Sequence, residues 1–136
     1  MEIEFPYKDE ASDVFESVKR PRVKLGFFSE VVKDWIILDE VLADTGADFC
    51  VLPRYIGEML AEDITTGKYI EIKGVAPGAR LIAYIHEFTI KLADYEFRAP
   101  VAVADSDDVP MILGRVGSLD LFEAIFSKGE RVKLKT

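Results

Sequence analysis

Apolar residues occur in short runs separated by turn-forming residues, a pattern that favours β-strands. β-Branched and aromatic residues are concentrated in 22–28 and 35–38. One apolar run stops abruptly at Asp44, and another is closed by Pro53. The predicted β segments lie at residues 22–28, 35–38, 41–43, 49–52, 69–72, 80–85 with a continuation to 92, 97–103 and 110–115. The chain is expected to end in a hairpin that turns at 127–130.

Two short helices complete the prediction. Pro53 can open a helix that runs to Leu60, because proline is tolerated in a first helical turn. Its expected apolar face consists of Tyr55, Ile56, Met59 and Leu60. The second short helix is expected near 117–123.

The chain is therefore predicted to form one all-β domain with one or two short helices. Its 136 residues suit a single domain, and 49% of them are hydrophobic, enough for a real core. We find no internal repeat and no linker rich in Pro, Gly or Ser. The core is expected at about 22–136, with 1–21 as an N-terminal extension or an edge strand.

The net charge disfavours nucleic acid as a partner. It is −8, from 25 acidic and 17 basic side chains, whereas phosphate binding needs a basic surface. Lys19, Arg20, Arg22 and Lys24 form a local basic cluster, but their alternation with Pro21 and Val23 is typical of the solvent face of a strand.

The sequence gives no indication of a membrane segment. No apolar run approaches the roughly 20 residues that span a bilayer, and the acidic start MEIEFPYKDE has no secretory signal pattern. A cytoplasmic location is expected. The single cysteine, Cys50, excludes an internal disulfide and zinc sites built on cysteine pairs, and His86 is the only histidine. No metal or other cofactor is expected.

The segment from Val41 to Asp48 carries the most specific chemical signal. Three apolar residues lead to Asp44, and Thr45, Gly46 and Ala47 follow it. A carboxylate at the end of a buried strand is held in a defined place, and a glycine beside it lets the backbone turn sharply. Taken alone, the triplet also fits an Asx turn that ends a strand.

With its flanking residues, this segment resembles the active-site motif of retropepsin-like aspartic peptidases, in which apolar residues precede Asp-Thr-Gly-Ala. The resemblance implies catalytic roles for Asp44, Thr45 and Gly46, with the Thr45 hydroxyl bonding across to the same loop of a symmetric partner. It implies a closed acid-protease barrel and extends over about residues 22–126.

The later segment Met111–Arg115 resembles the family's apolar-apolar-Gly-Arg strand, which threads beside the catalytic loop. The resemblance makes Gly114 and Arg115 structural supports, with Arg115 paired to Asp48. Val116 departs from the polar residue that is more common after Gly-Arg, and the first 20 residues have no counterpart in the family.

The turn at 74–78, with two glycines and a proline, lies where the family has its flap, the hairpin that closes over a bound peptide. An extended polypeptide would lie under the flaps of both copies. The residues expected to contact this substrate are Ala47, Asp48, Gly74, Val75, Ala76 and Ile112.

The number of motifs implies a homodimer. Aspartic peptidases use two carboxylates that share one proton, and this chain has one such motif, because Asp105-Ser106-Asp107 lacks the glycine. Twofold symmetry would place Asp44 beside its mate. The expected function is peptide-bond hydrolysis by a water that the Asp44 pair activates.

Two alternatives remain open. The first is a peptide-binding module on the same dimeric fold that does not cleave, since a fold does not guarantee its chemistry. The second is an unrelated small β-barrel whose Asp-Thr-Gly is only a turn.

Overall fold

The computed structural model describes residues 1–74 and 76–136. In this part of the chain the strands are β1 Glu2–Pro6, β2 Lys8–Ala11, β3 Ser17–Arg20, β4 Arg22–Ser29, β5 Asp34–Ala43, β6 Cys50–Leu52, β7 Lys68–Lys73, β8 Arg80–Leu92, β9 Tyr95–Ala104, β10 Ile112–Leu113, β11 Glu123–Ser127 and β12 Arg131–Lys135. The helical segments are the α-helix α1 Arg54–Leu60 and the 3-10 turns η1 Ile64–Thr66 and η2 Leu119–Leu121.

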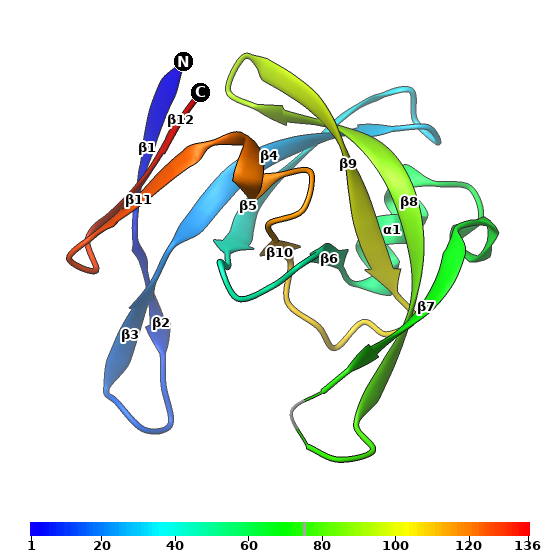
Figure 1. Cartoon of the computed structure of the whole chain (residues 1–136), viewed down its shortest axis with the longest axis horizontal. Coiled ribbons are helices and arrows are strands. Elements are labelled where there is room, and N and C mark those ends of the chain that lie inside the picture. The colour runs from blue at the N-terminus through cyan, green and yellow to red at the C-terminus, as the bar shows by residue number, and fades with distance from the viewer. Residues whose placement is uncertain (75) are drawn as a thin grey trace.

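Six strands form a closed barrel (Figure 1). Their order is β4-β5-β10-β6-β9-β8, and β8 pairs back onto β4 through Gly26 with Lys91 and Phe27 with Ile90. β7 extends the sheet beyond β8 as the outer strand of a hairpin. The predicted all-β barrel is confirmed, with a single α-helix in the described residues.

Alternation along the strands places the core inside this barrel. In β4 the side chains of Val23, Leu25 and Phe27 are almost fully buried, as the period of two in a strand requires. β9 is buried on both faces over its last four residues, 101–104. Its Val101 and Val103 belong to the main core, whereas Ala102 and Ala104 lie in a second, smaller cluster.

The chain termini form a separate sheet in the order β1-β12-β11. β1 pairs antiparallel with β12 along its whole length and is an outer strand of this sheet. Between this sheet and β4, strands β2 and β3 pair only with each other and form a two-stranded hairpin. We call this hairpin, residues 8–20, the arm. The sequence pattern did not predict it.

Three predicted elements differ from the structure. The runs 35–38 and 41–43 belong to one strand, β5, because Asp39 and Glu40 continue it with their side chains in solvent. The helix expected near 117–123 is only the turn η2, since Gly117 has a left-handed φ of 72° that no α-helix continues through.

The third difference is the buried face of α1. Ile56, Gly57 and Leu60 are buried, whereas Tyr55 and Met59 are exposed. Gly57 lies so close to Val103 that a Cβ there would collide with it. No helix in the described residues is long and apolar enough to cross a bilayer.

Candidate active site

Asp44 follows β5 directly and is fixed by its neighbours on both sides. Its backbone N–H donates to the Leu113 carbonyl of β10 at 3.0 Å, and its Oδ1 accepts from the Gly46 N–H at 2.9 Å. The Ala47 N–H then donates to the Asp44 carbonyl at 3.3 Å, which closes a turn. Asp44 is half-buried and Thr45 is exposed, so the loop presents its polar groups at the surface.

Gly46 makes the sharp turn that its sequence position predicts, but not through a left-handed backbone. Its small size is what the site uses. A Cβ at this position would lie 3.2 Å from the Asp44 Oδ1 that the Gly46 N–H contacts. A side chain would therefore crowd the carboxylate.

β10 supports the Asp44 loop by pairing with the strands on both sides of it. Ile112 and Leu113 pair parallel with Leu42 and Ala43 of β5, while Ile112 also pairs antiparallel with Val51 of β6. β10 thus lies between the strand that enters the Asp44 loop and the strand that leaves it (Figure 1).

The residues after β10 close over the same loop. The Arg115 and Val116 N–H groups donate to the Ala47 and Asp48 carbonyls, both at 2.9 Å. Gly114 is packed against the loop so closely that a Cβ would overlap the Phe49 carbonyl and lie 3.0 Å from the Ala47 oxygen. Only glycine fits there without movement of the backbone.

The Arg115 side chain makes weaker contacts than its backbone. Its Nη1 lies 3.8 Å from Asp48 Oδ1, and its Nε lies 3.5 Å from Asp120 Oδ1. These side chains are at least 44% exposed, so the ion pairs contribute little to stability. The backbone bonds of Arg115 give more support to the loop.

Ser118 and Cys50 form a buried support that sequence reasoning missed. The Ser118 hydroxyl donates to the Gly114 carbonyl at 2.6 Å and accepts from the Cys50 thiol, with Sγ and Oγ 3.1 Å apart. Burial raises the pKa of Cys50, which keeps the thiol protonated and able to donate. Nothing in the local sequence signals this pairing, because the two residues are 68 positions apart.

A groove of about 650 Å³ begins at the Asp44 loop. Gly46, Ala47 and Asp48 form one part of its wall, and β10 contributes Ile112. The remaining lining, which the sequence pattern did not assign, is mostly apolar and comprises Phe49, Val51, Ile70, Glu71, Ile72, Lys73, Leu81, Val109 and Pro110. The alternation of Ile70 and Ile72 in β7 is the one sequence signal that could have placed part of this wall.

The hairpin β7–β8 borders the groove and extends beyond it (Figure 1). At its tip the Gly74 N–H donates to the Ala79 carbonyl at 2.8 Å, and the Ala79 N–H donates to the Ala76 carbonyl at 3.1 Å. Gly78 has a φ of 80°. Gly74 and Ala76 lie past the residues that line the groove, and Val75 lies outside the described residues.

The described residues contain no group of three His, Cys, Asp or Glu side chains placed to hold a metal ion. What the site offers is a half-buried carboxylate whose loop forms part of the wall of an apolar groove, with a hairpin along the groove's edge.

Comparison with known proteins supports one fold. No protein-family model matches the sequence, and no curated protein matches it. Among solved structures, a retropepsin-like aspartic protease from Rickettsia conorii is similar over 98% of this chain and 91% of its own, with 20% sequence identity and a TM-score of 0.64. EIAV protease in complex with the inhibitor HBY-793 is 24% identical over 78% of this chain and 88% of its own, with a TM-score of 0.49. The chain has the retropepsin-like fold.

Proposed function

We propose that this protein is an aspartic endopeptidase that works as a homodimer, with one Asp44 from each copy. The observation that carries the proposal is the position of Asp44. It is held at the end of a buried strand by Leu113 and Gly46, it is partly exposed, and its loop opens onto an apolar groove. An Asx turn that only ended a strand would not need this support from β10.

The dimer follows from the chemistry. Peptide hydrolysis by carboxylates needs one ionised and one protonated acid, which two neighbouring carboxyl groups achieve by sharing a proton. The exposed Thr45 beside Asp44 supplies a hydroxyl that can bond to the partner's loop. A twofold axis next to this loop would bring the two Asp44 side chains together.

The proposed reaction uses only these two acids and water. The ionised Asp44 takes a proton from a water whose oxygen attacks the peptide carbonyl carbon, while the protonated Asp44 of the other copy donates to the carbonyl oxygen. The resulting gem-diol collapses with cleavage of the C–N bond. The Asp44 that took the water proton gives it to the leaving nitrogen, and the other Asp44 takes back a proton from a gem-diol hydroxyl. The pair is left with one proton, ready for another cycle.

The groove fits an extended polypeptide with apolar side chains. Ile70, Ile72, Leu81 and Ile112 give it an apolar wall, and the β7–β8 hairpin provides backbone groups along its edge. Ala47, Asp48, Gly74, Val75 and Ala76 are proposed as further substrate contacts. Gly114 and Arg115 are proposed to position the catalytic loop, and the reaction needs no metal or other cofactor.

The first experiment is cleavage of a mixed peptide library at about pH 5, where a coupled acid pair holds one proton. Wild type should cleave, and Asp44→Asn should lower the rate by at least about 10³-fold, since it removes the general base and the shared proton. Asp94→Asn is the matched control and should leave the rate unchanged. Asp94 is exposed in the turn between β8 and β9, at the opposite end of β8 from the β7–β8 turn. A rate insensitive to Asp44→Asn would overturn the assignment.

Activity should be higher at mildly acidic than at alkaline pH, because the shared proton is lost as pH rises. A rate that still increases above about pH 8 would contradict this mechanism. If a well-folded dimer binds peptides from the library and cleaves none, the protein is instead a peptide-binding module on this fold.

A further inference from the structure

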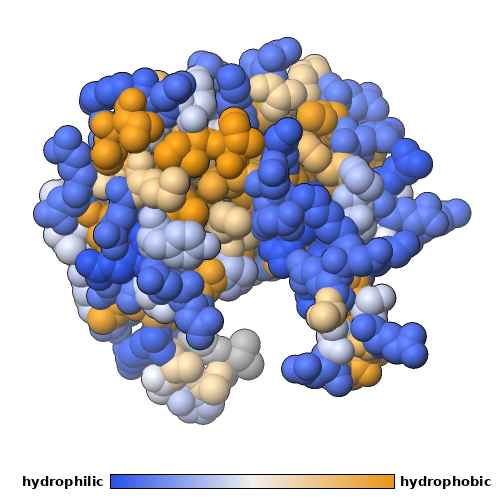
Figure 2. All heavy atoms as spheres, turned by 180° about the vertical axis from the view of Figure 1, so that it is seen from behind, coloured by the Kyte–Doolittle hydropathy of each residue, from blue (hydrophilic) through white to orange (hydrophobic). Residues whose placement is uncertain are grey.

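The arm is the part of the fold that the proposed reaction does not use. It projects from the barrel on the same side as the β7–β8 hairpin, and the Asp44 loop lies between the two (Figure 1). Figure 2 shows both hairpins from behind as separate projections, with the surface hollowed between them. An element in this position needs an explanation, because it borders the approach to the candidate site.

The root of the arm is joined directly to the catalytic strand. The Pro21 carbonyl, immediately after β3, accepts from the N–H of Ala43 at 2.9 Å. Arg22 pairs with Leu42 in the first register position of β4 against β5. The arm therefore starts beside the residue that precedes Asp44.

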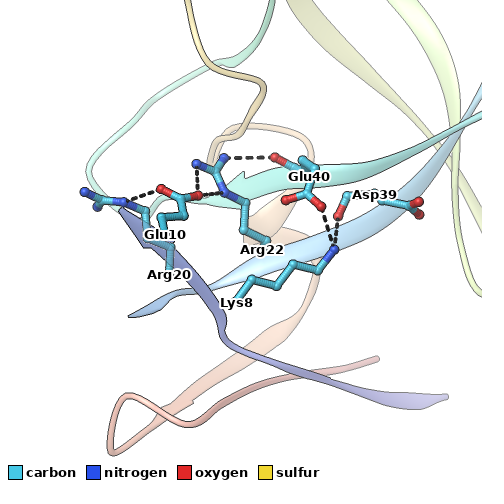
Figure 3. Close-up of polar contacts among 6 residues, drawn as sticks. All are labelled: Lys8, Glu10, Arg20, Arg22, Asp39 and Glu40. Carbon is cyan, nitrogen blue, oxygen red and sulfur yellow. Dashed lines mark hydrogen bonds and ion pairs between the residues drawn. The ribbon is translucent and has the colours of Figure 1, made fainter. Parts of the chain in front are cut away.

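Ion pairs set the direction of the arm relative to β5 (Figure 3). Lys8 Nζ lies 2.9 Å from Glu40 Oε1 and donates to the Asp39 carbonyl at 3.1 Å. Glu10 binds both Arg20 and Arg22, and Arg22 also donates to the Glu40 carbonyl at 2.9 Å. The basic residues that the sequence places on the solvent face of a strand are thus partly engaged in anchoring the arm.

The tip of the arm is a hydrogen-bonded turn that carries two exposed apolar side chains between Asp13 and Glu16. The Ser12 hydroxyl accepts from the N–H groups of Val14 and Phe15, at 3.2 and 3.1 Å. Val14 is 83% exposed and Phe15 63%, the highest values among the large apolar side chains of the described residues. Figure 2 shows apolar surface at the end of this projection.

Within one copy, the part of the chain that the structure describes leaves the arm largely exposed. β2 and β3 pair only with each other, and none of their residues is fully buried. An isolated two-stranded hairpin is at best marginally stable in water. The exposed Phe–Val pair on this hairpin is apolar surface that a second molecule could bury.

We propose that the arm grips a second copy of this chain, and that its Val14–Phe15 tip is buried beside the active-site groove of that copy. The inference rests on the proposed homodimer. A copy that brings its Asp44 next to this Asp44 must approach the face that carries the loop, and the arm projects from that face. On this face the groove walls, with Val109, Pro110 and Ile112, offer the apolar surface that the tip matches. Each site is then completed by the arm of the other copy.

Dimer affinity tests the proposal. Sedimentation velocity over a dilution series should show a dimer dissociation constant about 10- to 100-fold higher for Val14→Ser/Phe15→Ser than for wild type, the cost of leaving these side chains exposed. The control is Val31→Ser/Val32→Ser in the β4–β5 turn, which is also exposed but lies at the far end of β4. It should dimerise within about twofold of wild type, as expected for a surface change away from an interface.

A photoreactive phenylalanine analogue at Phe15 locates the contact without loss of the apolar side chain. In a mixture of isotopically light and heavy chains, the crosslink should join one copy to the other, at peptides that include the groove wall. Crosslinks only within one chain, or tip and control variants that dimerise as wild type does, would overturn the proposal.

The cleavage assay separates this proposal from the peptidase assignment. If the wild-type dimer does not cleave and the tip variant dimerises more weakly, the arm contact is supported and the peptidase function is refuted. If the wild-type dimer cleaves peptides and the tip variant has the same dimer dissociation constant as wild type, the peptidase function is supported and the arm contact is refuted. If the wild-type protein stays monomeric up to about millimolar concentration, the range of the weakest specific contacts, the proposed contact between the arm and a second copy is refuted.

Discussion

The Asp44 loop and the arm are neighbours, because a hydrogen bond joins Pro21, just after the arm, to Ala43, just before the loop. The two regions are nevertheless held by different interactions. The loop is fixed by backbone hydrogen bonds from β10 and by a glycine packed against its carbonyl groups. The arm is fixed mainly by ion pairs between side chains that remain partly exposed. One region depends on close packing and the other on screened charge.

This difference matches what each region is proposed to do. A catalytic carboxylate must be held within a few tenths of an ångström, which only preorganised, tightly packed groups achieve. An element that meets a second copy needs a defined direction but gains from adjustable side chains. The two regions should therefore respond very differently to mutation.

Gly114→Ala should have the largest effect on stability. Its Cβ would overlap the Phe49 carbonyl, so the backbone of β10 or of the Asp44 loop must move. We expect a loss of about 3 kcal/mol in the free energy of unfolding, measured by chemical denaturation, together with loss of peptidase activity.

Gly26→Ala is the matched control for that change. A Cβ there would meet only side-chain atoms, the nearest being Ile37 Cδ1 at 3.3 Å, and the effect should stay within about 1 kcal/mol. Equal losses in the two variants would show that the Asp44 loop is no more tightly packed than an ordinary strand.

Ser118→Ala should have the next largest effect. It leaves the buried Cys50 thiol without its acceptor and removes one of the two donors to the Gly114 carbonyl, which keeps the Leu119 N–H, at a cost of about 1–3 kcal/mol. Ser127→Ala, in an exposed position of β11, should change stability by less than about 0.5 kcal/mol. If the two serine variants have the same free energy of unfolding, the hydrogen bonds of Ser118 with Cys50 and Gly114 do not support the loop.

The same contrast explains what the sequence could predict. Local patterns located the strands of the barrel, the helix from Arg54 to Leu60 and the Asp44 turn, because strand alternation and proline act over a few residues. Gly57 was missed as part of the helix face because its close contact is Val103, far along the chain. The Ser118–Cys50 pair was missed for the same reason.

The arm escaped prediction for a different reason. β2 and β3 contain no fully buried residue, and their sequences KDEA and SVKR have no alternation of apolar and polar residues that would reveal a strand. Their pairing is aided by cross-strand charges such as Glu10 with Arg20. The proposed roles of Asp44, Thr45 and the substrate contacts came from resemblance. One copy supplies a single Asp44, so the second carboxylate of the proposed pair belongs to the other copy.

Arg22→Gln should have the smallest effect of the three on stability, although it removes the most enclosed ion pair of the arm. The Arg22 side chain is 14% exposed and that of Glu10 31%, so solvent screens part of the attraction. We expect a loss of no more than about 1 kcal/mol, which shrinks in about 1 M salt because the Debye length falls to about 3 Å. Lys19→Gln, exposed in the same hairpin, controls for the loss of a positive charge and should have almost no effect. A loss above about 2 kcal/mol that high salt does not reduce would mean that the arm is integrated with the barrel core. The arm would then be a rigid extension of the barrel, and the contrast with the Asp44 loop would no longer hold.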